Sequence, residues 1–252
     1  MAYTRNIHKI LTEWTTSPQV ITLDGAAGTG KTSLARSLAS QLGFSYLDTG
    51  AMYRGIALRL GEGAWLQSGT WLEEQLAGIR FSLTGSGDQT LLVLDGHPVS
   101  EEIRREDVGM WASKLAQLTV VREHLTRCQR ELGNSFSLVA EGRDMGTVVF
   151  PGAQFKYFLF ADSEERARRR QRQIREEYGE EADLSEIRRD LEKRDRQDSG
   201  RSLAPLRAAE DAVSIDTTDK AFSQVLHLIL EDMQSRLGEI QDPTHDRGSL
   251  SL

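Results

Sequence analysis

The chain has 252 residues, of which 38% are hydrophobic, and it carries a formal net charge of −7 with an isoelectric point near 5.4. This acidic balance argues against a general binder of nucleic acids or anionic membranes, so we expect neither as a partner. A single cysteine, which cannot form an internal disulfide, and the lack of any apolar stretch approaching the ~20 residues of a membrane span favour a cytoplasmic protein.

The first segment, residues 1–19, is polar and mixed, and it lacks the apolar core of an export signal. We expect it to be a flexible leader, and we expect a second flexible segment over residues 238–252. The expected domain therefore covers residues 20–237.

Strands and helices alternate along this domain. Apolar runs of strand length lie at 20–23, 44–47, 138–141, 155–161 and 213–216. Helices are predicted at 31–42, 51–60, 106–132 and 221–237, and Asp162 begins another one in a capping-box arrangement. Such alternation predicts an α/β fold of three layers, in which helices cover both faces of a central parallel sheet.

One stretch, residues 62–104, interrupts the alternation. Short strands at 80–83, 90–94 and 97–99 are joined by glycine-rich turns, which predicts a small antiparallel subdomain inserted into the domain. The run that ends in Asp95 also resembles the apolar strand and acid that hold Mg²⁺ in many ATPases. We favour a hairpin turn at Asp95-Gly96, because this dipeptide is a strong signal for a tight turn.

The most informative motif follows the first strand, where Gly25-x-x-x-x-Gly30-Lys31-Thr32 has the pattern of a phosphate-binding loop. Its glycines let successive N–H groups point at an anion, and the next helix presents its positive end to the same phosphates. Lys31 adds a charge for the β- and γ-oxygens, and the Thr32 hydroxyl is a ligand for Mg²⁺. The residues assigned to ATP are Gly25, Ala26, Ala27, Gly28, Thr29, Gly30, Lys31, Thr32 and Ser33.

A phosphate loop leaves the acceptor open, and a phosphorylated acceptor needs arginines that hold a second anion opposite the loop. Three segments supply them, at residues 48–54, 141–146 and 194–201. The first offers Arg54 and also Thr49, which is expected to cap the helix after it. The second follows a buried strand, at the edge where open α/β sheets bind ligands.

These segments, together with the loop, resemble the bacterial-type cytidylate kinases (CMP kinases), a family of P-loop nucleoside monophosphate kinases, over residues 20–237. The matching phrases are YLDTGAMYR at 46–54, GRDMGTVVFP at 142–151, SEERA at 163–167 and APL at 204–206. The resemblance implies a P-loop kinase fold with the insertion and with a lid near residues 170–200. It also implies transfer of the γ-phosphoryl group of ATP to CMP or dCMP with Mg²⁺. We expect a monomer.

The resemblance further implies roles for single residues. The acceptor phosphate would be held by Thr49, Arg54, Arg143 and Arg201. Cytosine would be read by Ser113, Arg122 and Asp144, and the ribose would be held by Arg194 with Asp198. The catalytic residues would be Lys31, Arg143 and Arg201. A hydrogen-bond acceptor such as Asp144 suits cytosine, because cytosine has an exocyclic amine that uracil lacks.

The chain departs from the family pattern at several positions. Ala26-Ala27 stands where Pro-Ser is usual, Thr32 where Gly or Ser is common, Thr49 for Ser, Glu141 for Asp and Gly200 for Asn. Each departure keeps the class of donor or acceptor, or lies where backbone N–H groups bind. We therefore expect the departures to affect affinity more than activity.

Simpler interpretations compete at several residues. The arginines at 166–175 are expected to form mainly a solvated face of i,i+4 pairs, with Arg168 and Arg172 reaching triphosphate oxygens as the alternative. His124 and His227 are expected to be packing or surface groups, and Cys128 is expected to pack on a helix.

Two other functions are also compatible with the sequence. The nearer alternative is a P-loop kinase for another small acceptor, such as UMP or shikimate. The other is a P-loop NTPase switch or nucleic-acid-binding regulator. The acidic charge and the lack of an Asn/Thr-Lys-x-Asp guanine-binding motif disfavour this second alternative.

Overall fold

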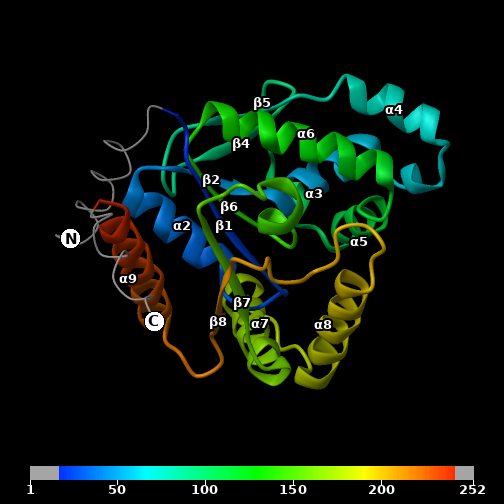
Figure 1. The fold of residues 1–252 in the computed structure, drawn as a ribbon. Coiled ribbons are helices and arrows are strands. Elements are labelled where there is room, and N and C mark those ends of the chain that lie inside the picture. Colours follow the sequence, from blue (N-terminus) through cyan, green and yellow to red (C-terminus); the bar gives the residue numbers. More distant parts are fainter. Residues whose placement is uncertain (1–16, 242–252) are drawn as a thin grey trace, which may run out of the picture.

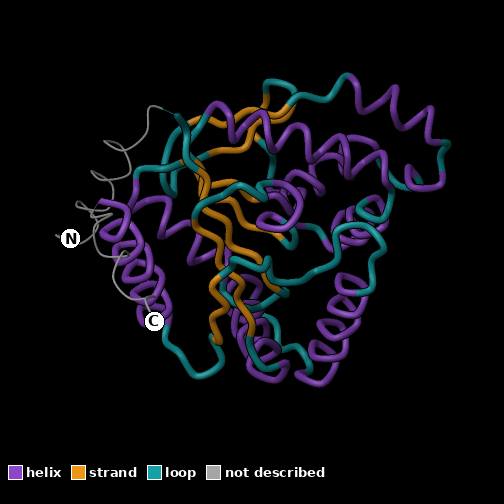
Figure 2. The backbone as a smooth tube through the Cα atoms, viewed as in Figure 1, coloured by secondary structure: helices purple, strands orange, loops and turns teal. Residues whose placement is uncertain are grey.

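A parallel β-sheet forms the centre of the computed structural model, which describes residues 17–241 apart from the side chains of residues 177, 178 and 239–241 (Figures 1 and 2). Its strands lie in the order β2-β6-β1-β7-β8, and each adjacent pair runs in parallel. They are β1 (Val20–Gly25), β2 (Ser45–Asp48), β6 (Leu138–Gly142), β7 (Phe155–Phe160) and β8 (Val213–Asp216). The predicted α/β fold with a central parallel sheet is confirmed.

Helices cover both faces of this sheet, which gives the three expected layers (Figure 1). The first face is covered by α2 (Lys31–Leu42) and α9 (Phe222–Gln241), whose apolar residues share one core with Ile21, Leu23 and Val139. The second face is covered by α3 (Thr49–Leu60), α5 (Glu106–Leu115), α6 (Thr119–Ser135) and a π-helical turn, η3 (Met145–Val149). Burial on both faces explains why the central strands are almost continuously apolar.

The insertion contains the predicted antiparallel sheet of β3 (Phe81–Thr84), β4 (Leu91–Leu94) and β5 (His97–Pro98). Asp95 and Gly96 connect β4 to β5 with positive φ angles of 51° and 84°, as a tight hairpin turn requires, so the hairpin interpretation is confirmed. The insertion also holds elements that the sequence patterns did not reveal. These are η1 (Ala64–Leu66), α4 (Gly69–Ala77) and η2 (Glu101–Arg104).

The single long helix expected over residues 106–132 is wrong, because the chain turns between α5 and α6. The buried stripe of α5 ends at Leu115 and that of α6 begins at Val121. In one straight helix this spacing would rotate the second stripe by about 120° from the first. The turn directs both stripes into the same core, and Leu118 adopts an extended conformation there. The Arg122 side chain donates to the carbonyl oxygen of Ala116 at 3.3 Å.

A helical hairpin of α7 (Ser163–Tyr178) and α8 (Leu184–Ser199) lies beyond the carboxyl ends of the strands (Figure 1). Ala167, Ile187 and Leu191 form its small core. The expected i,i+4 pairs are present on α7, where Arg168 contacts Glu164 at 2.5 Å and Arg169 contacts Glu165 at 2.9 Å. This hairpin coincides with the segment predicted to be a lid.

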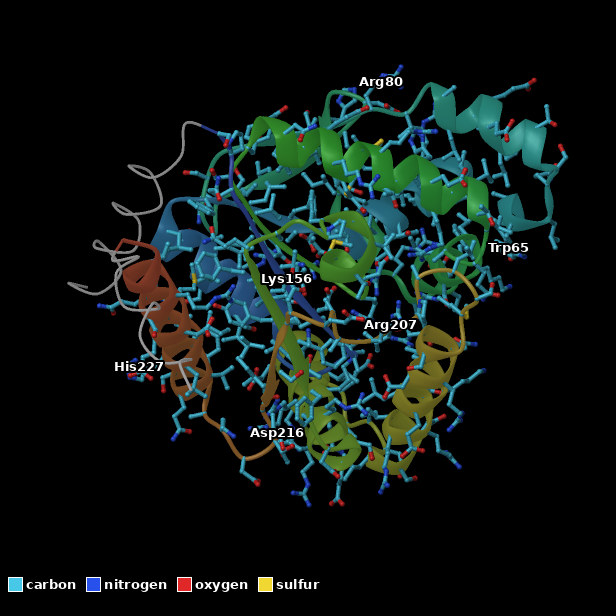
Figure 3. All side chains as sticks on the ribbon, in the orientation of Figure 1. Trp65, Arg80, Lys156, Arg207, Asp216 and His227 are labelled. Atoms are coloured by element: carbon cyan, nitrogen blue, oxygen red, sulfur yellow. The ribbon has the colours of Figure 1, made fainter. Side chains whose placement is uncertain are left out.

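The structure also places the two histidines, the cysteine and the end of the last helix. His227 points outward from α9 (Figure 3) and pairs with Glu231 at 3.1 Å, whereas His124 and Cys128 are buried on α6. Helix α9 continues to Gln241, past the predicted end at residue 237. Most of the expected leader lies outside the described residues. Within residues 17–241, none of the helices has the length and apolar character needed to cross a membrane.

Candidate active site

The candidate site lies where three parallel strands end together. The register pairs Asp24 of β1 with Gly142 of β6, and Asp48 of β2 with Glu141 of β6. The loops that follow these strands therefore begin side by side, at the edge where open α/β sheets bind ligands. They carry the phosphate loop and two of the three predicted arginine segments.

The phosphate loop has the backbone that its glycines predict. Gly25, Gly28 and Gly30 have positive φ angles of 150°, 79° and 89°. At Gly25 a Cβ atom would lie 2.1 Å from the carbonyl oxygen of Leu159, so a side chain is excluded there. Gly30 is the N-cap of α2, which places the positive end of this helix at the loop.

Lys31 lies across the loop rather than in solvent. Its ammonium group donates to the carbonyl oxygen of Ala26 at 2.6 Å, and the side chain is buried. Burial lowers the pKa of Lys31 to about 7, and the positive charge of Arg143 adds to this effect. The positive charge of Arg143, which belongs to the second arginine segment, therefore acts on Lys31 of the phosphate loop.

The first turn of α2 holds the other predicted donor-site residues. The Thr32 hydroxyl donates to Glu141 Oε2 at 2.9 Å, while Ser33 is exposed on the same turn. Thr29 is buried, and its hydroxyl donates to the carbonyl oxygen of Ala26 at 3.0 Å. Its own carbonyl oxygen accepts from Thr217 at 3.2 Å, which ties the loop to the segment after β8.

Thr49 does not cap α3, which corrects the sequence expectation. Asp48 is the N-cap instead, and its carboxylate accepts from the backbone N–H of Ala51 at 2.9 Å. The Thr49 hydroxyl donates to the carbonyl oxygen of Glu141 at 2.7 Å. The Asp48 carboxylate is favoured over the Thr49 hydroxyl as the cap, because a negative charge interacts more strongly with the positive end of a helix. Thr49 is thereby held beside β6.

One carboxylate on α8 gathers two of the predicted arginines. Asp198 accepts from Nε of Arg143 at 2.9 Å and from Nη2 of Arg201 at 2.5 Å. The Arg201 Nε atom is buried and has no hydrogen-bond partner among residues 17–241. A buried N–H without a partner is costly, so this donor is suited to an anionic ligand.

Arg54 and Arg194 face the same region from α3 and α8. The Arg54 guanidinium donates to the carbonyl oxygen of Ile103 at 3.2 Å. Burial lowers the pKa of Arg54, Asp48 opposes that shift, and the positive charge of Arg194 strengthens it. Two positive groups that repel each other can be stabilised by an anion that binds between them.

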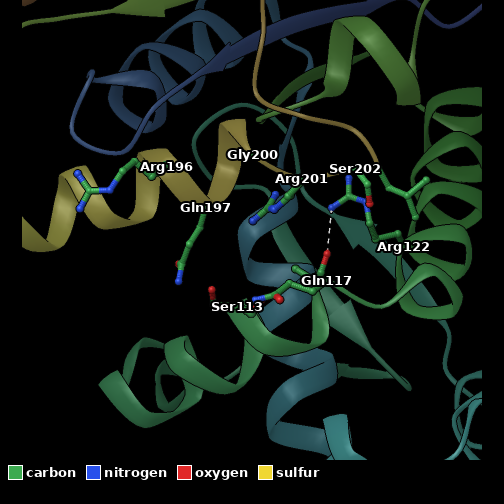
Figure 4. A pocket seen from close by; sticks show the side chains of 10 residues that line it. Ser113, Gln117, Arg122, Arg196, Gln197, Gly200, Arg201 and Ser202 are labelled. Atoms are coloured by element: carbon green, nitrogen blue, oxygen red, sulfur yellow. Dashed lines mark hydrogen bonds between the residues drawn. The ribbon is translucent and has the colours of Figure 1, made fainter.

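A cavity of about 360 Å³ lies between α5 and α8 (Figure 4). Its lining includes Ser113, Arg122 and Arg201, which the sequence assigned to the acceptor. Arg122 forms a buried ion pair with Asp144 at 2.5 Å, and the Tyr53 ring lies 5.9 Å from its guanidinium carbon. Burial raises the pKa of Asp144, and the charges of Arg122 and Arg201 oppose the rise. The cavity thus has a polar wall.

Comparison with known proteins identifies the family. A profile described as Cytidylate kinase matches residues 21–235. The chain belongs to the cytidylate kinase family. It is 50% identical over 215 residues to a cytidylate kinase of Oleidesulfovibrio alaskensis, which covers 85% of this chain and 98% of the relative. It is 47% identical over 221 residues to a cytidylate kinase of Maridesulfovibrio salexigens, which covers 88% of this chain and 99% of the relative.

In this member of the cytidylate kinase family, two residues make contacts that the sequence assignment did not include. Asp198, assigned with Arg194 to the ribose, holds Arg143 and Arg201 in the structure. Glu141 was noted only as a departure from aspartate, yet it accepts from Thr32 and from the Tyr46 hydroxyl. Its place at the carboxyl end of β6, next to the phosphate loop, is the signal that could have drawn attention to it.

Sequence reasoning also missed the burial of Arg166. Expected on a solvated face, Arg166 is buried and contacts Asp195 at 2.7 Å and the carbonyl oxygen of Ala27 at 3.2 Å. The local sequence does distinguish Arg166 from its neighbours on α7. Arg168 and Arg169 each have a glutamate four residues earlier, whereas Arg166 has only Asp162, whose carboxylate caps α7.

Proposed function

We propose that this protein transfers the γ-phosphoryl group of ATP to CMP or dCMP, which gives ADP and CDP or dCDP. The observation that carries the proposal is that Asp198 gathers Arg143 and Arg201 while the charge of Arg143 acts on Lys31 of the phosphate loop. Positive groups of two separate segments thus lie within interaction range, as transfer between two anionic nucleotides requires. Membership of the cytidylate kinase family supports the same reaction.

The donor would bind at the phosphate loop. The backbone N–H groups of residues 25–33 and the N-terminus of α2 would hold the β- and γ-phosphates. Lys31 would leave the carbonyl oxygen of Ala26 for a phosphate oxygen, a stronger acceptor because it carries charge. The buried ammonium group would then be fully protonated.

Magnesium fits beside this loop. Mg²⁺ prefers oxygen ligands and commonly binds through substrate phosphates, water and one or two protein groups. The Thr32 hydroxyl would hold the ion. The Glu141 carboxylate, which accepts from that hydroxyl at 2.9 Å, would orient the hydroxyl. Bound with ATP, the ion supplies charge neutralisation at the phosphates.

The acceptor phosphate would lie among Arg54, Arg143 and Arg201, with Thr49 at its edge. In the free protein Asp198 neutralises two of these guanidinium groups. A phosphate dianion would replace part of that pairing and would also use the unpartnered Nε of Arg201. Asp198 would then be free to accept from the ribose hydroxyls, and Arg194 would donate to the ribose oxygens.

The base would occupy the cavity beside Ser113 and the Arg122–Asp144 pair. Cytosine presents an exocyclic amine and an unprotonated N3, which match a carboxylate acceptor and a guanidinium donor. Uracil presents a carbonyl group and an N3–H at those places and would leave both protein groups poorly paired. Buried polar groups without partners cost enough to give strong discrimination.

Phosphoryl transfer needs no strong base in this arrangement. The transition state is loose, so positioning and charge neutralisation by Lys31, Arg143 and Arg201 would provide most of the acceleration. Water must be excluded, because it would otherwise accept the phosphoryl group. Closure of the insertion and of the α7–α8 hairpin over both nucleotides would exclude it.

A panel of acceptors tests the proposal. ADP formation from ATP is measured with CMP, dCMP, UMP, AMP and shikimate under one set of conditions. We expect kcat/KM for CMP to exceed that for UMP by at least about 100-fold, since a site with paired polar groups rejects a mismatched base strongly. Faster transfer to UMP or shikimate than to CMP would overturn the proposal.

A further inference from the structure

Ala27 of the phosphate loop makes two contacts with the α7–α8 hairpin. Its side chain packs against the hairpin core of Ala167, Ile187 and Leu191. Its carbonyl oxygen accepts from Nη1 of Arg166 at 3.2 Å. The loop that would bind the donor is therefore attached to the hairpin at one residue, by an apolar contact and by a charge-assisted hydrogen bond.

Arg166 connects this loop residue to α8. Its Nη2 atom lies 2.7 Å from Oδ2 of Asp195, and its Nε atom donates to the carbonyl oxygen of Ala161 at 3.1 Å. The arginine side chain is only 7% exposed and that of Asp195 is 24% exposed, so the arginine end of this pair is shielded from solvent. A Cβ atom at Gly28 would lie 3.1 Å from the Cβ atom of Arg166, which shows how closely the loop and α7 approach.

Asp195 lies on the helix that carries the acceptor-site groups. Arg194 precedes it in α8, and Asp198, which holds Arg143 and Arg201, follows one turn later. Direct contacts therefore run from Ala27 through Arg166 to Asp195, and the backbone of α8 connects Asp195 to Asp198 and its two arginines. A chain of packed and hydrogen-bonded groups of this kind can carry energetic coupling between two sites.

The peptide plane between Ala27 and Gly28 can transmit phosphate binding at the loop to Arg166. In a trans peptide the carbonyl of Ala27 and the N–H of Gly28 point to opposite sides. When a phosphate holds the N–H of Gly28, the Ala27 carbonyl is held toward Arg166. This fixes the guanidinium, then Asp195, and then the position of α8.

We propose that Arg166 and Asp195 are positioning residues that couple the two nucleotide sites, so that a filled phosphate loop strengthens the binding of CMP. This inference rests on the proposed function for the identity of the two ligands. Neither residue needs to touch CMP. Their effect reaches the acceptor through α8, and it must be reciprocal, because CMP then strengthens donor binding by the same factor.

The test is calorimetric binding of CMP with and without a saturating non-hydrolysable ATP analogue and Mg²⁺. For the unaltered protein we expect the analogue to lower the Kd of CMP by about fivefold or more, as is typical of coupled sites. In Asp195→Asn and Arg166→Lys this factor falls below about twofold. The control is Glu164→Gln, which breaks the exposed Arg168–Glu164 pair on the same helix and should keep the full factor.

Each outcome decides the matter. A coupling factor near one in the unaltered protein, or a full factor in both variants, overturns the coupling while leaving the proposed function standing. No binding of CMP to the unaltered protein overturns the proposed function itself. Loss of the factor in either variant with an unchanged melting temperature supports the inference, because a purely structural role would not alter the ratio of two Kd values. Loss in the Glu164→Gln control would contradict the assignment to Arg166 and Asp195.

Discussion

The hydroxyl of Thr32 donates a 2.9 Å hydrogen bond to the carboxylate of Glu141, which joins the first turn of α2 to the end of β6. Burial raises the pKa of Glu141 and Asp48 adds to the rise, while Lys31 and the hydrogen bonds from Tyr46 and Thr32 oppose it. The carboxylate thus holds Thr32 in one orientation beside the phosphate loop. We expect a hydroxyl fixed in this way to bind the proposed Mg²⁺ with little reorganisation.

Thr32→Val is predicted to raise the Mg²⁺ concentration for half-maximal turnover by about 10-fold, because the variant keeps the shape of the side chain but loses the oxygen ligand. Turnover is measured against Mg²⁺ at saturating nucleotide concentrations. Thr32→Ser, which keeps the hydroxyl, is the control and should behave like the unaltered protein. An unchanged Mg²⁺ dependence in Thr32→Val would remove Thr32 from the metal site.

Lys31→Ala is predicted to lower kcat by about 100-fold or more, because a buried charge that meets the transferring phosphoryl group is lost. The fold should remain intact, since burial of this ammonium group is itself unfavourable, as its lowered pKa indicates. Initial rates and the melting temperature are measured together, with the exposed Lys220→Ala as control. Turnover within about threefold of normal would exclude Lys31 from the mechanism.

ATP binding is predicted to take up protons above neutral pH. In the free protein the pKa of Lys31 is lowered to about 7 by burial and by Arg143, so at pH 8 most of the side chain is neutral. A bound phosphate favours the charged form and raises this pKa, so binding at pH 8 should take up close to ~1 proton, and the apparent affinity should fall as the pH rises above 7. Calorimetry in two buffers of different ionisation enthalpy measures the uptake. The same uptake in Lys31→Ala would contradict the assignment.

Asp144→Ala is predicted to narrow the preference for CMP over UMP by at least about 10-fold in kcat/KM. The variant removes the carboxylate that pairs with Arg122 at 2.5 Å, so the guanidinium no longer has a fixed orientation toward the base. Steady-state rates with both acceptors give the ratio. If the ratio stays the same, Asp144 does not read the base.

The local part of the fold could be predicted from the sequence. The glycine spacing and the apolar run before it predicted the phosphate loop, and α2 has the predicted bounds, Lys31–Leu42. These features depend on neighbouring residues, whose propensities and turn chemistry act locally. Asp95-Gly96 was predicted as a turn for the same reason.

The relations between distant segments could not be predicted in this way. Nothing in the spacing of residues 194–201 shows that Asp198 holds Arg143, which comes from another strand end. The break after Leu115 depends on how α5 and α6 pack against the same core. The lack of a glutamate four residues before Arg166 distinguishes it from Arg168 and Arg169, but it does not show that the approach of α7 to the phosphate loop buries Arg166.

Gly25→Ala is predicted to destabilise the protein by about 3 kcal/mol or more, because the new Cβ atom would lie 2.1 Å from the carbonyl oxygen of Leu159 and φ is 150°. This corresponds to a fall in melting temperature of at least about 6 °C for a chain of this size. Gly152→Ala is the matched control, since no atom lies within 4 Å of its Cβ position. Equal melting temperatures for the two variants would contradict the geometry of the loop.

The central claim is that a phosphoryl group passes directly from a donor in the phosphate loop to an acceptor held by the arginine cluster. The most direct measurement follows phosphorus NMR signals of a mixture of the protein, MgATP and CMP over time. The account predicts that the CMP signal and the β-phosphate signal of ATP fall at equal rates while nucleoside diphosphate signals grow, with no inorganic phosphate. Growth of ADP together with inorganic phosphate, and without CDP, would contradict it.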